Sequence, residues 1–214
     1  ARRFVQGAAQ APADIEHYRW MTFLGPDDKR RLYTQALRAR LRESDVYRPV
    51  RDCLAAASGD DLLNRQLYAD LCIYLADDIL VKVDRMSMAT SLETRAPFLD
   101  AGVMELAFSF PGNLKVRGRE RKYVLKRALD GVLPPRILTR SKEGFSIPMK
   151  NWLRQALKPL MLDLLASGRL AHRGLFEAAE VRRRVDEHLA GRENHAHVLF
   201  GLMVFERWAR EFLD

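Results

Sequence analysis

The chain has 214 residues, of which 48% are hydrophobic and 30% are charged, so it is not a disordered tail and can bury an ordinary globular core within one domain. Lysine and arginine (36) outnumber acidic residues (28), and the net charge of +8 favours anionic partners such as nucleic acid or phosphorylated small molecules, although arginine-rich helices are often simply soluble. No apolar run approaches the roughly 20 residues of a membrane span, so we expect no membrane partner.

The chain contains only two cysteines, Cys53 and Cys72. Both stand in apolar patterns of helical spacing, so we expect reduced core residues and no disulfide. This cysteine usage predicts a cytoplasmic protein, and the first residues lack the apolar segment of a signal peptide.

The first 26 residues contain little patterned sequence, and we expect residues 1–26 to be a linker or the cut edge of a longer polypeptide. Helical spacing begins at Asp27 and predicts one helix of roughly three to four turns that ends near Leu41. Pro49 then opens a second, short helix that ends near Gly59.

A longer helical run follows, with Asp60 or Asp61 as its cap. It leads into the stretch from Tyr74 to Asp100, which combines apolar residues at helical spacing with many acids and bases. Ionised groups among Met, Ala, Leu and Phe need partners or a ligand. Four such groups carry this argument: Asp84, Arg85, Glu93 and Arg95.

Pro97 pushes the residue before it out of the helical region, so an extended or turning segment is expected there. Asp100 can cap a helix over residues 103–108. Residues 111–113 predict a turn, and residues 114–116 predict a short extended segment.

A charged tip at residues 117–120 precedes a helix over residues 121–129, which Gly131 is placed to terminate. Residues 139–148 contain too many polar and turn-forming residues for a regular element. We predict a cationic glycine loop there, which is a candidate ligand contact.

Apolar spacing predicts a helix over residues 152–165 that is interrupted at Pro159, and two more helices over residues 181–190 and 197–212. There is no internal repeat, low-complexity tract or sustained alternation of strand type. The fold class is therefore predicted to be mainly α, with residues 27–214 forming one helical region.

The sequence offers little support for a metal site or a catalytic triad. The histidines at positions 188, 195 and 197 do not share a helix face at a zinc-like spacing, so we expect surface or capping histidines. The adjacent acids Asp77 and Asp78 could bind magnesium, but an acidic helix start that balances nearby cations is favoured. No metal site is predicted within the chain.

Basic segments at residues 117–122 and 182–184 could touch phosphates, but neither interleaves aromatic residues for base stacking, so no nucleic-acid partner is predicted. Lys122 differs because it begins a helix, where a cation can join the helix N-terminus in binding an anion. Lys142, beside Gly144, offers the same possibility.

Four ordered motifs carry a family resemblance. Residues 77–89 read DDILVKVDRMSMA, residues 91–100 read SLETRAPFLD, residues 121–126 read RKYVLK and residues 141–145 read SKEGF. Together they closely resemble the synthetase domain of glutamine-dependent asparagine synthetases. The resemblance covers residues 74–153, and the flanking helices match in general character only.

The resemblance implies an amide ligase that uses ATP with Mg²⁺. In that reaction a carboxylate substrate, with aspartate as the first expectation, forms an acyl-adenylate and pyrophosphate, and ammonia released from glutamine then attacks. The resemblance also implies that the chain is the helical carboxyl-terminal portion of an α/β synthetase domain of the ATP-pyrophosphatase type.

Matching positions imply roles for individual residues. Lys142 and Lys122 match the catalytic lysines that lie by the phosphates, and Gly144 belongs to the same loop as Lys142. Asp84 and Arg85 match a charged pair near the acyl-adenylate. All three non-lysine positions are expected to bind substrate or ATP.

Glu93 and Arg95 match the family segment Glu-x-Arg-x-Pro-Phe-Leu-Asp and are also candidate substrate- or ATP-binding residues. A second interpretation stays open for them. A buried Glu–Arg pair could simply hold the turn before Pro97.

Two family features are not found in the sequence: the Ser-Gly-Gly-x-Asp-Ser loop that binds pyrophosphate, and the glutaminase domain with its leading cysteine. We expect these missing regions to be partners of the chain, and the chain alone to form no amide. The alternatives are a stand-alone helical module that binds a nucleotide or a partner protein, and a family member that acts on another acceptor, as in ring closure to β-lactams.

Overall fold

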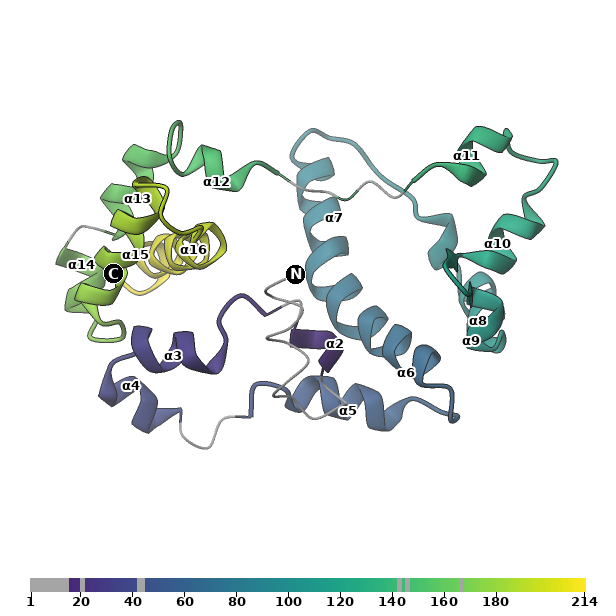
Figure 1. The fold of residues 1–214 in the computed structure, drawn as a ribbon, viewed down its shortest axis with the longest axis horizontal. Coiled ribbons are helices and arrows are strands. Elements are labelled where there is room, and N and C mark those ends of the chain that lie inside the picture. Colours follow the sequence, from purple (N-terminus) through teal and green to yellow (C-terminus); the bar gives the residue numbers. More distant parts are fainter. Residues whose placement is uncertain (1–15, 20–21, 42–44, 142–143, 145–146, 166–167) are drawn as a thin grey trace. The chain divides into compact units, whose positions relative to one another are not determined.

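The computed structural model describes residues 16–19, 22–41, 45–141, 144, 147–165 and 168–214. Helices dominate this part of the chain, and the one sheet in it has two short strands, which confirms the mainly α class (Figure 1). None of the described helices has both the length and the apolar character needed to cross a membrane.

The chain divides into two compact units. Unit 1 comprises residues 1–17 and 46–143, and unit 2 comprises residues 18–45 and 144–214. Along the sequence, the division between residues 17 and 18 falls within a short helix, α2 (Glu16–Arg19).

Unit 2 is built from helices that surround a shared apolar core. Its helices are α3 (Pro26–Leu32), α4 (Gln35–Arg40), α12 (Met149–Trp152), α13 (Lys158–Leu165), α14 (Gly168–His172), α15 (Ala178–Leu189) and α16 (Ala196–Phe212). The longest of these, α16, packs against α12, α13 and α15 (Figure 1). Leu32, Leu153, Met161 and Leu199 are completely buried in this core.

The single helix predicted from Asp27 to Leu41 is wrong, because the chain breaks into α3 and α4 at Tyr33 and Thr34. Tyr33 is extended and forms an isolated bridge with Phe176. The Thr34 amide donates to the Leu175 carbonyl at 3.0 Å, and the Thr34 hydroxyl accepts the Leu37 amide at the start of α4. A contact with a distant part of unit 2 therefore overrides the local helical pattern.

A fully buried carboxylate, Glu206, holds together one side of unit 2. Its oxygens accept hydrogen bonds from Arg173 (2.6 Å) and Arg210 (3.0 Å). Burial by itself raises the pKa of Glu206, but the hydrogen bonds from Arg173 and Arg210 outweigh burial and the net pKa is lowered. The two arginines also reach Asp214 and Asp163, so the buried charge belongs to a connected network.

Unit 1 is organised along a continuous helical rod made of α6 (Leu62–Ala69), η1 (Asp70–Leu80) and α7 (Val81–Met88), seen in Figure 1 as one uninterrupted run. The middle segment is an 11-residue π-helix. A preceding helix, α5 (Arg48–Ala56), packs against both α6 and η1. Of the two predicted candidates for the cap, Asp60 and Asp61, it is Asp61 that caps the rod, by accepting the Asn64 amide at 3.1 Å.

The remainder of unit 1 consists of short elements. These are η2 (Pro97–Leu99), α8 (Ala101–Ser109), α9 (Gly112–Lys115), β1 (Val116–Arg117), β2 (Glu120–Arg121), α10 (Tyr123–Ala128) and α11 (Pro135–Thr139). The predicted Asp100 cap of α8 is confirmed, since its carboxylate accepts the amides of Gly102 and Val103. The extended segment predicted at residues 114–116 is wrong for its first two residues, which are helical in α9. The Asp61 carboxylate accepts the Gly112 amide at 2.5 Å and so helps to start that short helix.

Unit 1 buries few apolar side chains. Among its described residues only Val50, Leu54 and Ala69 are buried hydrophobic residues. Larger apolar side chains of the rod and of the elements after it are exposed: Tyr74, Val81, Val83, Met86, Met88, Leu92, Phe98, Val103 and Leu106. Cys53 and Cys72 are free, as predicted, but they are half-buried rather than core residues.

Candidate functional site

The predicted residues of α7, Asp84 and Arg85, lie on an exposed part of the rod. In the described part of the chain neither side chain has a hydrogen-bond or ion-pair partner. The apolar residues beside them in the sequence, Val83 and Met86, are themselves exposed. The two charges are therefore available to a ligand or to another surface.

Glu93 and Arg95 form the ion pair that the sequence suggested, with 2.5 Å between a carboxylate oxygen and a guanidinium nitrogen. The pair is not buried, since the side chains are 71% and 84% exposed. It lies in the segment without helix or strand between α7 and η2, where no other element covers it. An exposed pair of this kind contributes about 0 to 1 kcal/mol to stability, so it is a weak device for holding a turn.

Lys122 stands at the start of α10, immediately after a tight hairpin. In that hairpin Val116 pairs with Arg121 and Arg117 pairs with Glu120. Lys122 has a left-handed backbone (φ 59°), a conformation that costs energy for a residue with a β-carbon. Its side chain is exposed, and no hydrogen bond or ion pair engages it within the described residues. The helix α10 has only six residues, so we treat Lys122 as a single cation and not as part of an anion site at a helix N-terminus.

Three cations near Lys122 have partners of their own. Arg117 donates a hydrogen bond to the Tyr123 hydroxyl at 2.6 Å, and Arg117 and Arg127 lie 5.1 and 5.2 Å from the centre of the Tyr123 ring. The hydrogen bond from Arg117, and then that from Arg127, lower the pKa of Tyr123. Lys126 pairs with Glu120 at 3.5 Å. Lys122, like the adjacent Arg121, has no such side-chain partner within the described residues. Residue spacing alone did not reveal the central position of Tyr123.

Only part of the glycine loop predicted at residues 139–148 lies within the described residues. Lys142 lies outside the described residues, and its role stays a prediction. Gly144 is exposed, and a β-carbon added there would meet nothing within 4 Å. Gly144 belongs to unit 2, whereas Asp84 and Lys122 belong to unit 1. Among the described members of the predicted set, the one direct contact is the ion pair between Glu93 and Arg95.

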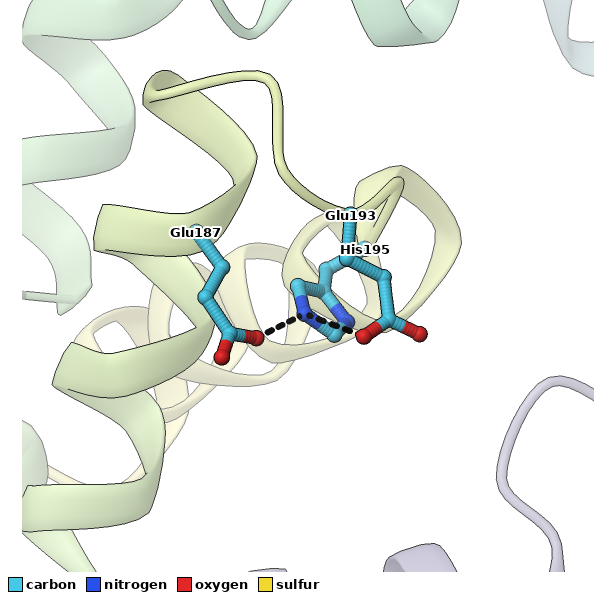
Figure 2. Close-up of side chains that lie close together, drawn as sticks. All are labelled: Glu187, Glu193 and His195. Atoms are coloured by element: carbon cyan, nitrogen blue, oxygen red, sulfur yellow. Dashed lines mark hydrogen bonds and ion pairs between the residues drawn. The ribbon is translucent and has the colours of Figure 1, made fainter.

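The structure also gathers a polar group that the sequence did not reveal. Glu187 on α15, Glu193 in the following loop and His195 at the start of α16 have potential ligand atoms within 4.8 Å of one another (Figure 2). His195 Nε2 lies 2.8 Å from Glu187 and 3.8 Å from Glu193. Both carboxylates face the same ring nitrogen, and Glu187 also binds Arg183 at 2.7 Å. Imidazole with two carboxylates is a donor set that zinc accepts, but a hydrogen bond between His195 and Glu187 accounts for the short contact.

The expectation of surface or capping histidines is wrong for His188 and incomplete for His195. His188 is completely buried and His195 is 8% exposed, although His195 does stand at the start of α16. Burial, followed by the charge of Arg154, lowers the pKa of His188. The His195 amide donates to the His188 ring at 3.2 Å, and this hydrogen bond stabilises the turn between α15 and α16.

A largely apolar cavity of about 250 Å³ lies between helices of unit 2. Its lining includes Leu162, Leu165, Phe176, Val181 and Val185. None of the described residues predicted to act on substrate or ATP lines it. The cavity is therefore separate from the predicted chemistry.

Comparison with known proteins gives a consistent result. A family profile described as asparagine synthase matches residues 3–210. A Mycobacterium tuberculosis protein, named provisionally as a glutamine-hydrolyzing asparagine synthetase, is 37% identical over 172 residues, which cover 80% of this chain and 26% of the relative. Glutamine-hydrolyzing asparagine synthetase 1 of Bacillus subtilis is 30% identical over 146 residues, which cover 68% of this chain and 23% of the relative. The chain thus spans about a quarter of the length of these relatives. No solved structure matches.

Proposed function

Because this chain belongs to the asparagine synthase family, we propose that it is the carboxyl-terminal segment of the synthetase domain of an ATP-dependent amidotransferase that works in the cytoplasm. A carboxylate oxygen of the substrate attacks the α-phosphate of ATP, and pyrophosphate leaves. Ammonia derived from glutamine then attacks the acyl carbon, and AMP leaves as the amide forms. Aspartate is the proposed substrate, and Mg²⁺ accompanies the ATP.

This proposal rests on one observation: charged side chains at the motif positions have no hydrogen-bond or ion-pair partner within the described residues. Asp84, Arg85 and Lys122 are exposed and have no side-chain partner in the described part of the chain. Buried networks such as that of Glu206 use their charges to hold the fold. Charges that hold nothing together within the chain are available to a bound substrate.

Lys122 and Lys142 have the chemistry that adenylation requires. Negative charge grows on the non-bridging oxygens and on the departing pyrophosphate as the carboxylate attacks. A fixed cation that meets this charge stabilises the transition state more than the ground state. We assign these two lysines to the phosphates, and the pair Asp84 and Arg85, with Gly144, to the acyl-adenylate.

Glu93 and Arg95 are assigned to substrate binding within the same proposal. Their ion pair is exposed and contributes little to the fold, which supports a role toward a ligand rather than in holding the turn before Pro97. A ligand carboxylate could compete with Glu93 for the Arg95 guanidinium, because a planar guanidinium binds carboxylates in pairs of parallel hydrogen bonds.

The pyrophosphate loop and the glutaminase belong, in this proposal, to regions of a synthetase other than these 214 residues. The exposed apolar side chains of α7 and α8, including Val83, Met86, Met88, Val103 and Leu106, support this view. Exposed apolar side chains of this size can take part in an interface with another part of a protein. We therefore propose that the chain alone neither hydrolyses glutamine nor forms an amide.

A chimera tests the assignment. The matched segment of the Bacillus subtilis relative is replaced by this chain, and aspartate-dependent pyrophosphate release from ATP is measured. We expect the chimera to release pyrophosphate, and Lys122→Met or Lys142→Met to lower the rate by roughly 100-fold. Arg182→Met, which removes an exposed cation of unit 2, serves as the matched control and should leave the rate unchanged.

Two results would contradict the proposal. Wild-type rates in both lysine variants would remove these residues from the catalytic set. Pyrophosphate release by the isolated chain at the rate of the chimera would show that the chain needs no other region of a synthetase.

A further inference from the structure

Three side chains of unit 2 that belong to none of the family motifs converge on one atom. They are Glu187 in the last turn of α15, Glu193 in the turn that follows and His195 at the start of α16. Both carboxylates face Nε2 of His195 (Figure 2). One ring hydrogen can serve the hydrogen bond to Glu187 at 2.8 Å, but Glu193 lies 3.8 Å away, beyond hydrogen-bond distance. The second acid beside the same nitrogen therefore needs another explanation.

The backbone of the turn between α15 and α16 holds the three residues in place. The amides of Arg192 and Glu193 donate to the Glu187 carbonyl at 3.0 and 3.4 Å. The His195 amide donates to the ring of His188, which is completely buried. Because the backbone is fixed on both sides of the group, only side-chain movement is needed to bring the three ligand atoms onto one ion.

The separations between these atoms suit a zinc ion. Zinc binds nitrogen and oxygen ligands at about 2.0–2.2 Å, so neighbouring ligand atoms of a tetrahedral site lie about 3.3–3.5 Å apart. Nε2 of His195 lies 2.8 Å from Glu187 and 3.8 Å from Glu193, so one distance is shorter than that value and the other is longer. Shifts of about 0.5 Å in the two carboxylates would give both distances the tetrahedral value.

Glu187 and its neighbours have the charge and the support that a bound cation requires. The hydrogen bond from His195, and then that from Arg183, lower the pKa of Glu187, so its carboxylate is ionised at neutral pH. Arg183 binds Oε1 of Glu187 at 2.7 Å and is itself held by Glu180 at 2.8 Å, which leaves Oε2 toward the histidine. Such a partner orients a ligating carboxylate. Glu193 is 66% exposed, so water can reach the fourth position of a tetrahedral site.

We propose that Glu187, Glu193 and His195 form a zinc site that joins the end of α15 to the start of α16. Nε2 of His195 and one carboxylate oxygen from each glutamate bind the ion, and water occupies the fourth position. A neutral imidazole binds a metal through its unprotonated nitrogen, so the ring hydrogen stands on Nδ1 in the bound state. No residue of this set is assigned to ATP or substrate, so the inference holds whether or not the chain takes part in adenylation.

Zinc fits this donor set better than magnesium does. Imidazole is a good ligand for zinc, whereas magnesium prefers oxygen ligands in a near-octahedral shell that keeps several waters. An ion that binds the folded chain and not the unfolded one stabilises the fold by mass action. We therefore expect zinc, and not the magnesium that accompanies ATP, to raise the temperature at which unit 2 unfolds.

The test uses the 214-residue chain, stripped of metal with EDTA and then freed of the chelator by gel filtration. Isothermal titration with zinc chloride at neutral pH should show saturable binding of one ion per chain. Thermal unfolding followed by circular dichroism should shift to a higher temperature with zinc, and EDTA should reverse the shift. An excess of magnesium chloride should leave the zinc affinity unchanged.

Variants locate the ion. His195→Ala should abolish the one-site binding, and Glu193→Gln should weaken it by at least about tenfold. Glu193 is largely exposed and glutamine keeps its shape, so this second result does not depend on how well His195→Ala folds. His197→Ala is the matched control, because it removes an exposed histidine only two residues from His195 and should leave zinc binding unchanged.

Three outcomes would overturn the proposal. The metal-free chain could show no saturable zinc binding. The affinity could stay the same in both His195→Ala and Glu193→Gln, which would place the ion elsewhere on the chain. Magnesium could displace zinc as readily as zinc itself, which would show that the imidazole takes no part in binding.

Discussion

Units 1 and 2 use their apolar and charged residues in opposite ways. Unit 2 buries both kinds: Leu199 and Glu206 are completely covered, and arginines neutralise the buried carboxylate. Unit 1 leaves both kinds exposed, with Met86 at 64% exposure and Asp84 and Arg85 without partners in the described part of the chain. The contrast shows that the motif charges Asp84 and Arg85 are not among the charges that hold the fold together.

The largest loss of stability is expected when the buried charge of unit 2 is removed. Glu206→Ala leaves Arg173 and Arg210 facing each other without their shared carboxylate, and such loss of one member of a buried ionic network costs about 3 to 5 kcal/mol. Urea unfolding followed by circular dichroism measures the change. Glu211→Ala is the control, because that residue pairs with Arg207 at 3.5 Å on the surface. Equal effects of the two variants would show that burial does not set the contribution of these charges.

A matched pair of apolar truncations compares the units directly. Leu199→Ala opens a cavity in the core of unit 2 and should cost about 2 to 5 kcal/mol. Met86→Ala removes an exposed side chain of α7 and should change stability by less than about 0.5 kcal/mol in the chain alone. The same urea unfolding measures both. A loss of several kcal/mol in Met86→Ala would mean that α7 is covered in solution.

The smallest expected effect concerns the start of the rod. Asp61 accepts the amides of Asn64 and Gly112, and these hydrogen bonds, with that of Gly112 first, lower the pKa of its carboxyl group. Asp61→Ala removes the cap and should cost about 1 kcal/mol. Faster amide hydrogen exchange in α6 and α9 should accompany this loss, whereas Asp61→Asn keeps an acceptor and should largely preserve protection. Unchanged exchange in Asp61→Ala would show that the cap does not hold these helices.

Local signals in the sequence were sufficient for several elements. The caps at Asp61 and Asp100 need only a carboxylate followed by free amides two or three residues later, and both are confirmed. The helix predicted over residues 152–165 is indeed interrupted, but the break lies at residues 153–157 and not at Pro159, which stands in the first turn of α13. These features depend on residues that are neighbours along the chain.

Other predictions failed where distant residues decide the conformation. The bridge between Tyr33 and Phe176 divides a helix that the apolar spacing made continuous. The exposure of the Glu93–Arg95 ion pair likewise could not be predicted from the sequence, because burial depends on which elements cover a segment. Lys142 falls outside the described residues, and the joint role of the predicted site stays a prediction.

Residue patterns along the chain were enough to predict a mainly helical protein, the start of several helices and a resemblance to asparagine synthetases. Capping, proline geometry and apolar spacing act over a few residues, so they can be read in order along the chain. The burial of His188 and Glu206, and the lack of side-chain partners for Asp84 and Arg85 within the described residues, became known only from the folded structure. Those outcomes require residues far apart in sequence to pack together, and composition and spacing do not specify which surfaces meet.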